Sequence, residues 1–152
     1  DMVRPGIALY GHYPDPSCEG LDGPGLEPVM SLKTRVSAVR TLPAGACVSY
    51  GRTATLEEET TLAVLPIGYA DGLPRSLSNR GDVLVGGKMR PIVGRVCMDM
   101  CMVRADEGVK EGDVVTLFSA DCPVERYAAW DGTIQYELLC AVSPRVPREY
   151  RG

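Results

Sequence analysis

The chain has 152 residues, a formal net charge of −4 and 45% hydrophobic residues, which is typical of one globular domain. Proteins that bind nucleic acids or membrane surfaces need a basic face, and the acidic charge balance gives no support for one. No apolar stretch approaches the roughly 20 residues of a membrane-spanning helix, and the first residues lack the charged-then-apolar order of a secretion signal.

The N-terminal residues lead straight into an apolar run through Tyr10, as if the chain began inside a strand. Position 1 is not an initiator methionine, so we expect a fragment of a longer protein. Residues 11–28 are rich in Gly, Pro and Asp, which predicts a long loop. Residues 31–40 alternate between apolar and polar side chains, which predicts one half-buried strand.

Further short apolar runs, bounded by Gly, Pro or Asp, predict more strands. They cover residues 47–50, 60–67, 82–85, 88–91, 92–102 and 114–118. The run 60–67 is apolar throughout most of its length, so we expect a central strand there. Gly86-Gly87 separates two runs and predicts a hairpin turn. The longest run contains Arg95 and Asp99, which folding alone would turn to solvent or pair locally.

The spacing of apolar residues becomes helical near the C-terminus. Residues 123–130 and 133–142 predict two short helices, with Asp121 and Asp131 as start signals, and residues 145–148 predict a final extended piece. The whole pattern predicts a mainly β fold, barrel-like, with one or two short helices near the C-terminus.

The chain has six cysteines and one histidine. The cysteines stand at positions 18, 47, 97, 101, 122 and 140, and no pair has CxxC spacing. An even count also fits disulfides in a secreted protein, but this chain is long enough to fold without them. We expect reduced, structural cysteines, because Cys97, Cys101 and Cys140 lie in apolar runs where cysteine acts as a small hydrophobic residue. With His12 as the lone histidine, no metal site is expected.

Seven segments, taken together, resemble the alanine racemase family. They occur in the family's order and span nearly the whole chain: VRPGIALYG, MSLKTRV, VSYGRT, LPIGYADG, PIVGRVCMDM, TIQYE and RVPR. Each is weak alone, and the ordered set is highly specific. The resemblance implies a parent enzyme with an N-terminal α/β barrel, which carries pyridoxal 5′-phosphate (PLP) on a lysine, and a C-terminal β-domain. Residues 1–10 would then be the last barrel strand and linker, and residues 11–152 the β-domain.

The resemblance also implies that this chain alone is inactive. Its lysines are Lys33, Lys88 and Lys110, and none lies in a segment like the PLP-lysine motif of the family. The expected activity of the parent is interconversion of L- and D-alanine by two-base proton transfer. This chain would supply one of the two bases.

By resemblance, the barrel lysine serves one face of the substrate Cα and Tyr50 serves the other. A free tyrosine has a pKa of about 10, so the site would have to stabilise phenolate with nearby cations. Arg4 resembles the residue that donates to the PLP ring nitrogen and, as a permanent donor, keeps that nitrogen unprotonated. Gly6 and Ile7 match backbone contacts to the PLP phosphate, and Tyr136 matches a tyrosine whose hydroxyl reaches the same phosphate.

The resemblance assigns further residues to the substrate. Met98 and Asp99 match the segment that meets the substrate carboxylate from the neighbouring subunit. Tyr69 matches a tyrosine that narrows the entrance, and a tight gate favours alanine over larger amino acids. Positions in the outer entrance corridor match Arg75, Arg95 and Ile134. The family works as a head-to-tail homodimer in which each β-domain lends its tyrosine to the partner's PLP.

Three alternatives stay open. Related serine or broad-specificity racemases share this domain, and Met100 replaces a Gln found in many alanine racemases, although Tyr136 favours alanine. Fold-related PLP decarboxylases use a cysteine proton donor that Cys97 could match, but the residues flanking it fit the racemases better. The third alternative is a non-catalytic β-barrel binding module.

The resemblance also implies a cellular setting. The parent would be a bacterial, cytoplasmic isomerase that makes D-alanine for peptidoglycan precursors. Its small-molecule partner would be an amino acid. We expect no nucleic-acid partner and no membrane segment in this chain.

Overall fold

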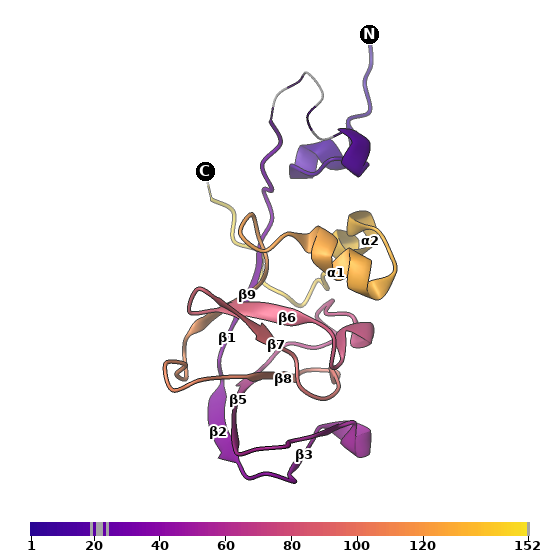
Figure 1. Cartoon of the computed structure of the whole chain (residues 1–152). Helices are drawn as coiled ribbons and strands as arrows, with labels where there is room; N and C mark the ends of the chain where they lie inside the picture. The colour runs from indigo at the N-terminus through magenta and orange to yellow at the C-terminus, as the bar shows by residue number, and fades with distance from the viewer. Residues whose placement is uncertain (19, 21–22, 24, 152) are drawn as a thin grey trace.

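The structure is a computed structural model that describes residues 1–18, 20, 23 and 25–151. Within these residues, nine strands form three antiparallel sheets, followed by two α-helices (Figure 1). The mainly β fold with two short helices is therefore confirmed, and the three sheets are not closed into a barrel. No helix of the described residues is both long enough and apolar enough to cross a membrane.

The first sheet has the strand order β1-β9-β6-β7 and the second has the order β2-β5-β8. The first comprises β1 (Leu32–Arg35), β9 (Val114–Phe118), β6 (Asp82–Val85) and β7 (Lys88–Pro91). The second comprises β2 (Ala38–Leu42), β5 (Thr60–Leu65) and β8 (Cys101–Arg104). The third pairs β3 (Cys47–Val48) with β4 (Ala54–Thr55). The central position predicted for the 60–67 run is confirmed, because β5 lies between β2 and β8.

The hairpin predicted at Gly86-Gly87 is also confirmed. Strands β6 and β7 pair with Val85 opposite Lys88, which leaves the two glycines as the turn. Their φ values are +58° and +74°, in the left-handed region that a two-residue hairpin turn requires and that glycine adopts without a steric cost.

Two strand predictions are wrong in extent. Residues 31–40 form two strands in different sheets, because the chain changes partners between them. Val36 N donates to Asp113 O beside β9, and Ser37 N donates to Val64 O on β5. The run 47–50 forms a strand only as far as Val48, because Ser49 has φ +67° and turns the chain out of the sheet.

The long strand predicted for residues 92–102 is wrong. Only Cys101 and Met102 of that run lie in β8, and most of the rest forms an irregular loop. Gly94 has φ +80° and lies close to Val48, whose carbonyl oxygen would be 2.9 Å from a Cβ added at Gly94. This close approach bends the chain away from strand geometry.

Four 3-10 helices and two α-helices complete the described secondary structure. They are η1 (Gly6–Tyr10), η2 (Pro16–Cys18), η3 (Tyr50–Arg52), η4 (Arg75–Leu77), α1 (Val124–Asp131) and α2 (Gln135–Ala141). Both predicted α-helices are present, but their start signals are wrong. Their N-caps are Pro123 and Ile134, and neither makes a side-chain capping bond. The extended piece predicted at 145–148 is wrong for Arg145 and Val146, since Val146 N donates to Ser143 O in a turn.

The N-terminal segment contacts the helices rather than a sheet. Residues 1–5 have no regular structure, and Gly6–Tyr10 forms η1. His12 is 4% exposed, and its Nδ1 lies 2.7 Å from Glu125 Oε1 on α1. Gln135 on α2 donates to the carbonyl of Tyr13 at 2.8 Å.

The main core draws on both large sheets and both helices. Its fully buried members include Leu65 on β5, Val83 on β6, Leu117 on β9 and Val124 on α1. Full burial of such a side chain contributes about 1.5–3 kcal/mol. All six cysteines are free thiols. Cys101 and Cys122 are buried and Cys97 is partly buried, whereas Cys140 is exposed, contrary to a structural role in the core.

Candidate functional site

A depression of about 430 Å³ opens on the surface where loops from four parts of the chain meet. Its lining comprises Tyr50, Tyr69, Arg75, Arg95, Val96, Cys97, Met98, Asp99 and Met100. Six of these were singled out from the sequence: Tyr50, Tyr69, Arg75, Arg95, Met98 and Asp99. The fold therefore gathers in one place residues that are as many as 49 positions apart (from 50 to 99).

Tyr50 stands at the start of η3 on a strained turn. Ser49 before it has φ +67° and ψ −179°, a conformation that is essentially restricted to glycine and costs on the order of 1–3 kcal/mol. Two contacts hold this turn: Ser49 Oγ donates to Arg95 O at 3.0 Å, and Arg95 Nε donates to Tyr50 O at 3.1 Å. As a result Tyr50 projects outward, with 76% of its surface exposed.

The turn that carries Tyr69 packs directly on the neighbouring wall of the depression. Tyr69 N donates to Cys97 O, and Ala70 N donates to Met98 O, both at 3.0 Å. Gly68 makes this contact possible, because an added Cβ would lie 2.2 Å from Cys97 O. Tyr69 is partly exposed beside Met98, so its ring and the Met98 side chain form part of the rim.

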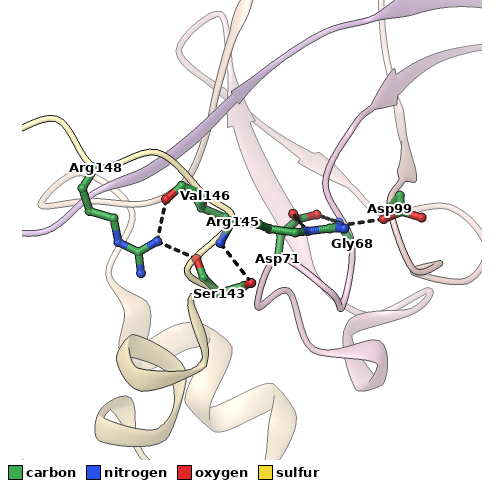
Figure 2. Close-up of polar contacts among 7 residues, drawn as sticks. All are labelled: Gly68, Asp71, Asp99, Ser143, Arg145, Val146 and Arg148. Carbon is green, nitrogen blue, oxygen red and sulfur yellow. Dashed lines mark hydrogen bonds and ion pairs between the residues drawn. The ribbon is translucent and has the colours of Figure 1, made fainter.

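One arginine links the turn of Tyr69 to the Met98–Asp99 loop (Figure 2). Arg145 Nε donates to Asp71 Oδ1, and its second terminal nitrogen donates to Asp99 Oδ1, both at 2.7 Å. The other oxygen of Asp71 accepts from Gly68 N at 2.8 Å. The hydrogen bonds to Asp71 and Asp99 raise the pKa of the Arg145 guanidinium above its ordinary value, so it stays charged.

No site role was predicted for Arg145 from the sequence, although the RVPR segment was recognised. The signal available in the sequence was indirect. Asp71 and Asp99 lie in separate, mainly apolar motifs, and a carboxylate in such surroundings is stabilised by a cation. Arg148 of the same segment has a different task. It donates to the carbonyls of Val142, Ser143 and Val146, which close the end of α2 and the turn after it.

The remaining predicted residues are not among those that line the depression. Arg4, Gly6 and Ile7 belong to the N-terminal segment, which lies at the end of the molecule near α1 and α2, whereas β3 and the η3 turn lie at the opposite end (Figure 1). Arg4 is exposed and Ile7 is buried. Ile134 and Tyr136, at the start of α2, are exposed and are not among the lining residues. A single chain thus holds two separate groups of predicted residues.

Comparison with known proteins identifies the family. The family model described as "Alanine racemase, C-terminal domain" matches residues 29–150. The chain belongs to the alanine racemase C-terminal domain family. An alanine racemase of Desulforamulus reducens is 52% identical over 159 aligned residues, covering 100% of this chain and 42% of the relative. The alanine racemase of Desulfovibrio desulfuricans is 47% identical, with 99% and 41% covered.

Solved structures agree with this membership of the alanine racemase C-terminal domain family. The alanine racemase of Streptomyces coelicolor A3(2) superposes with a TM-score of 0.91 at 42% identity. The match covers 97% of this chain and 40% of that one. The chain therefore spans about two fifths of the length of the alanine racemases that it matches.

Proposed function

We propose that this chain is the C-terminal domain of a PLP-dependent racemase that interconverts L- and D-alanine, and that it supplies Tyr50 as one of the two bases. The observation that carries the proposal is Tyr50 itself. A tyrosine with a packing role would be buried, but this one is 76% exposed at the rim of a depression. It stands on a strained turn, and such strain occurs often at functional sites.

The surroundings of Tyr50 suit proton transfer at an amino acid. Arg75 and Arg95 line the same depression, so the proposed base shares it with two cations. Met98 and Asp99 line the same depression, and we propose that they meet the substrate carboxylate there. We propose that Tyr69, another lining residue, narrows the entrance, which would favour a small side chain such as the methyl group of alanine.

The residues at the other end of the chain fit a phosphorylated cofactor. Arg4 offers an exposed guanidinium, and Tyr136 on α2 offers a partly exposed phenol. A Cβ added at Gly6 would meet nothing within 4 Å, so an anion can approach the Gly6–Ile7 backbone closely. When bound, PLP supplies an electron sink that acidifies the Cα proton of an amino acid. Arg4 would contact its ring nitrogen, and Gly6, Ile7 and Tyr136 its phosphate.

The separation of the two groups supports a head-to-tail homodimer. The N-terminal segment, which contains Arg4, lies at one end of the molecule and β3, which leads into the turn of Tyr50, lies at the other (Figure 1), so we propose that two chains contribute to each substrate site. Two antiparallel copies would place each Tyr50 beside the cofactor of its partner, with Arg75, Arg95 and Ile134 along the entrance corridor. Residues 1–10 would then belong to the end of a preceding barrel. We further propose a cytoplasmic bacterial enzyme that supplies D-alanine for peptidoglycan precursors.

The test replaces Tyr50 with phenylalanine in the full-length protein that contains this chain. Loss of a general base lowers the rate by roughly 10²–10⁴-fold. We expect Tyr50→Phe to lower kcat for L-alanine by this amount. The step affected most should be removal of the Cα proton from L-alanine, which is measured as exchange of that proton in deuterated water. Tyr150→Phe is the matched control, because Tyr150 is 93% exposed and lies outside the depression.

Near-normal kinetics of Tyr50→Phe would contradict the assignment of the base. A parent enzyme that turns over serine faster than alanine would keep the two-base chemistry but replace the substrate. A parent protein with no racemase activity on any amino acid would overturn the proposal.

A further inference from the structure

Arg145 links two loops that contribute residues to the depression. It lies after the last helix, yet its guanidinium contacts Asp71 in the Tyr69 turn and Asp99 in the Met98 loop (Figure 2). Asp71, in the Tyr69 turn, has a side chain only 13% exposed, and both of its oxygens have partners. Asp99, in the Met98 loop, is more than half exposed and accepts from Arg145 at 2.7 Å. Three segments therefore meet at one cation.

The charges of the depression give this contact a consequence. Among its lining residues the charged side chains are Arg75, Arg95 and Asp99. An unpaired Asp99 would repel an incoming carboxylate, whereas an Asp99 paired with Arg145 leaves the two other arginines to dominate the local potential. Arg145 itself is not among the lining residues, so it acts on the depression through Asp99 and Asp71.

The geometry adds a second consequence. The Tyr69 turn already bonds to Cys97 and Met98 through its backbone. Arg145 adds a side-chain link between the same two walls, because Asp71 belongs to the turn and Asp99 to the loop. A planar guanidinium with donors on two edges fixes both the distance and the orientation of two carboxylates.

We propose that Arg145 is a positioning residue that neutralises Asp99 and holds the Met98–Asp99 loop against the Tyr69 turn, so that the depression accepts the carboxylate of an amino acid substrate. The inference rests on the proposed function. It predicts that Arg145 governs the affinity for the substrate carboxylate more than the proton-transfer rate.

The first experiment measures racemisation kinetics of Arg145→Met in the full-length protein. We expect KM for both L- and D-alanine to rise about tenfold while kcat changes less than about threefold. Because the repulsion from an exposed Asp99 is screened by salt, raising KCl from 0.01 M to 0.5 M should lower the KM of the variant and have less effect on the wild type. Arg145→Lys keeps the charge without the planar fork and should restore KM in part.

The second experiment adds Asp99→Asn to Arg145→Met. Removal of the uncompensated charge should return KM to the value of Asp99→Asn alone, which a merely structural arginine would not produce. Arg104→Met is the matched control. Arg104 pairs with Glu58 and is not among the lining residues, so its loss should leave KM within twofold.

A third measurement does not depend on activity. Hydrogen exchange at the amides of Tyr69 and Ala70 should be faster in full-length Arg145→Met than in the wild type. Their hydrogen bonds to the Cys97 and Met98 carbonyls would no longer be supported by the side-chain link through Arg145. An unchanged KM in Arg145→Met, an equal rise in Arg104→Met, or unchanged exchange at both amides would each overturn the inference. If the wild type does not racemise amino acids, the proposed function fails, and the exchange measurement still tests the bracing.

Discussion

Arg95 and Tyr50 hold each other's segments through reciprocal backbone contacts. Arg95 Nε donates to the carbonyl of Tyr50 at 3.1 Å, while Ser49 Oγ, next to Tyr50, donates to the carbonyl of Arg95 at 3.0 Å. Neither contact uses the phenol of Tyr50. The arginine therefore positions the tyrosine by its backbone and leaves the side chain exposed toward the depression.

Replacing Arg95 with methionine should misplace Tyr50 without unfolding the domain. Methionine retains much of the aliphatic stem but loses the donor, and a hydrogen bond from a charged group contributes about 1.5–3 kcal/mol before solvent screening. We expect kcat/KM of the full-length protein to fall about tenfold, equivalent to about 1.4 kcal/mol. Arg80→Met, an exposed arginine outside the depression, should change kcat/KM less than twofold. Equal effects of the two variants would contradict the positioning role.

Adding a methyl group at Gly68 should separate the two walls of the depression. The new Cβ would lie 2.2 Å from Cys97 O and 2.4 Å from Met98 O, and both are backbone atoms that cannot rotate away. We expect Gly68→Ala to lower the free energy of unfolding by roughly 1–3 kcal/mol, the usual cost of overpacking. Urea denaturation of the 152-residue chain measures it.

Gly25→Ala is the control for this substitution, since a Cβ there meets no atom of the described residues within 4 Å and its φ is not in the left-handed region. Its effect should stay within about 0.5 kcal/mol. If both alanine variants are equally stable, the close approach at Gly68 does not exist in solution.

Local sequence patterns predicted the elements whose geometry depends on neighbours in sequence. The hairpin at Gly86-Gly87 needs only two residues that tolerate positive φ, and two consecutive glycines indicate such a turn in the sequence. The central strand β5 is visible because a strand buried on both sides is apolar along its length. The two C-terminal helices follow from their periodicity, but their caps do not, since Pro123 and Ile134 make no side-chain bond that a sequence signal could mark.

Features that depend on contacts between residues far apart in the sequence could not be predicted from local patterns. The run 92–102 has the composition of a strand, and only the approach of Gly94 to Val48 in three dimensions shows why it is a loop. Arg145 lies 74 positions from Asp71 and 46 from Asp99, so no local pattern pairs them. The six residues of the depression were found because their motifs resemble those of a family, which carries three-dimensional information that composition lacks.

Removing the carboxylate of Glu125 should loosen the N-terminal segment. Glu125 Oε1 lies 2.7 Å from Nδ1 of His12, which is 4% exposed, and Nε2 of the same ring has no hydrogen-bond partner among the described residues. Loss of the one partner leaves a buried ring with both nitrogens unsatisfied, at a cost of about 1–3 kcal/mol. We expect Glu125→Ala to lower the urea midpoint of the chain and to speed hydrogen exchange in residues 8–13.

Two further variants distinguish the loss of the hydrogen bond between Glu125 and His12 from the general effect of removing a glutamate side chain. Glu125→Gln keeps an acceptor oxygen and should cost less than Glu125→Ala. Glu57→Ala removes an exposed glutamate and should stay within about 0.5 kcal/mol of the wild type. A destabilisation by Glu57→Ala as large as that by Glu125→Ala would show that the contact with His12 contributes nothing specific.

Cys47, three residues before Tyr50, should be the thiol whose reactivity depends on a neighbouring arginine. Hydrogen bonds from Arg52 and then Thr55 lower the pKa of Cys47, whereas burial raises the pKa of Cys101 to about 12. The thiolate is the reactive form, so a lowered pKa gives more thiolate at a given pH and moves the alkylation profile to lower pH.

Iodoacetamide labelling from pH 6 to 10, read by mass spectrometry of Cys47 and Cys101 peptides, tests this prediction. Cys47 is partly exposed and should be labelled, whereas Cys101 should stay unlabelled while the chain is folded, because it is fully buried. Arg52→Met removes the donor that lowers the pKa of Cys47 and should move its profile to higher pH. The profile of the exposed Cys140 serves as the control and should not move. If Arg52→Met leaves the Cys47 profile in place, the arginine does not stabilise the thiolate, and the turn that leads to Tyr50 is held without this contact.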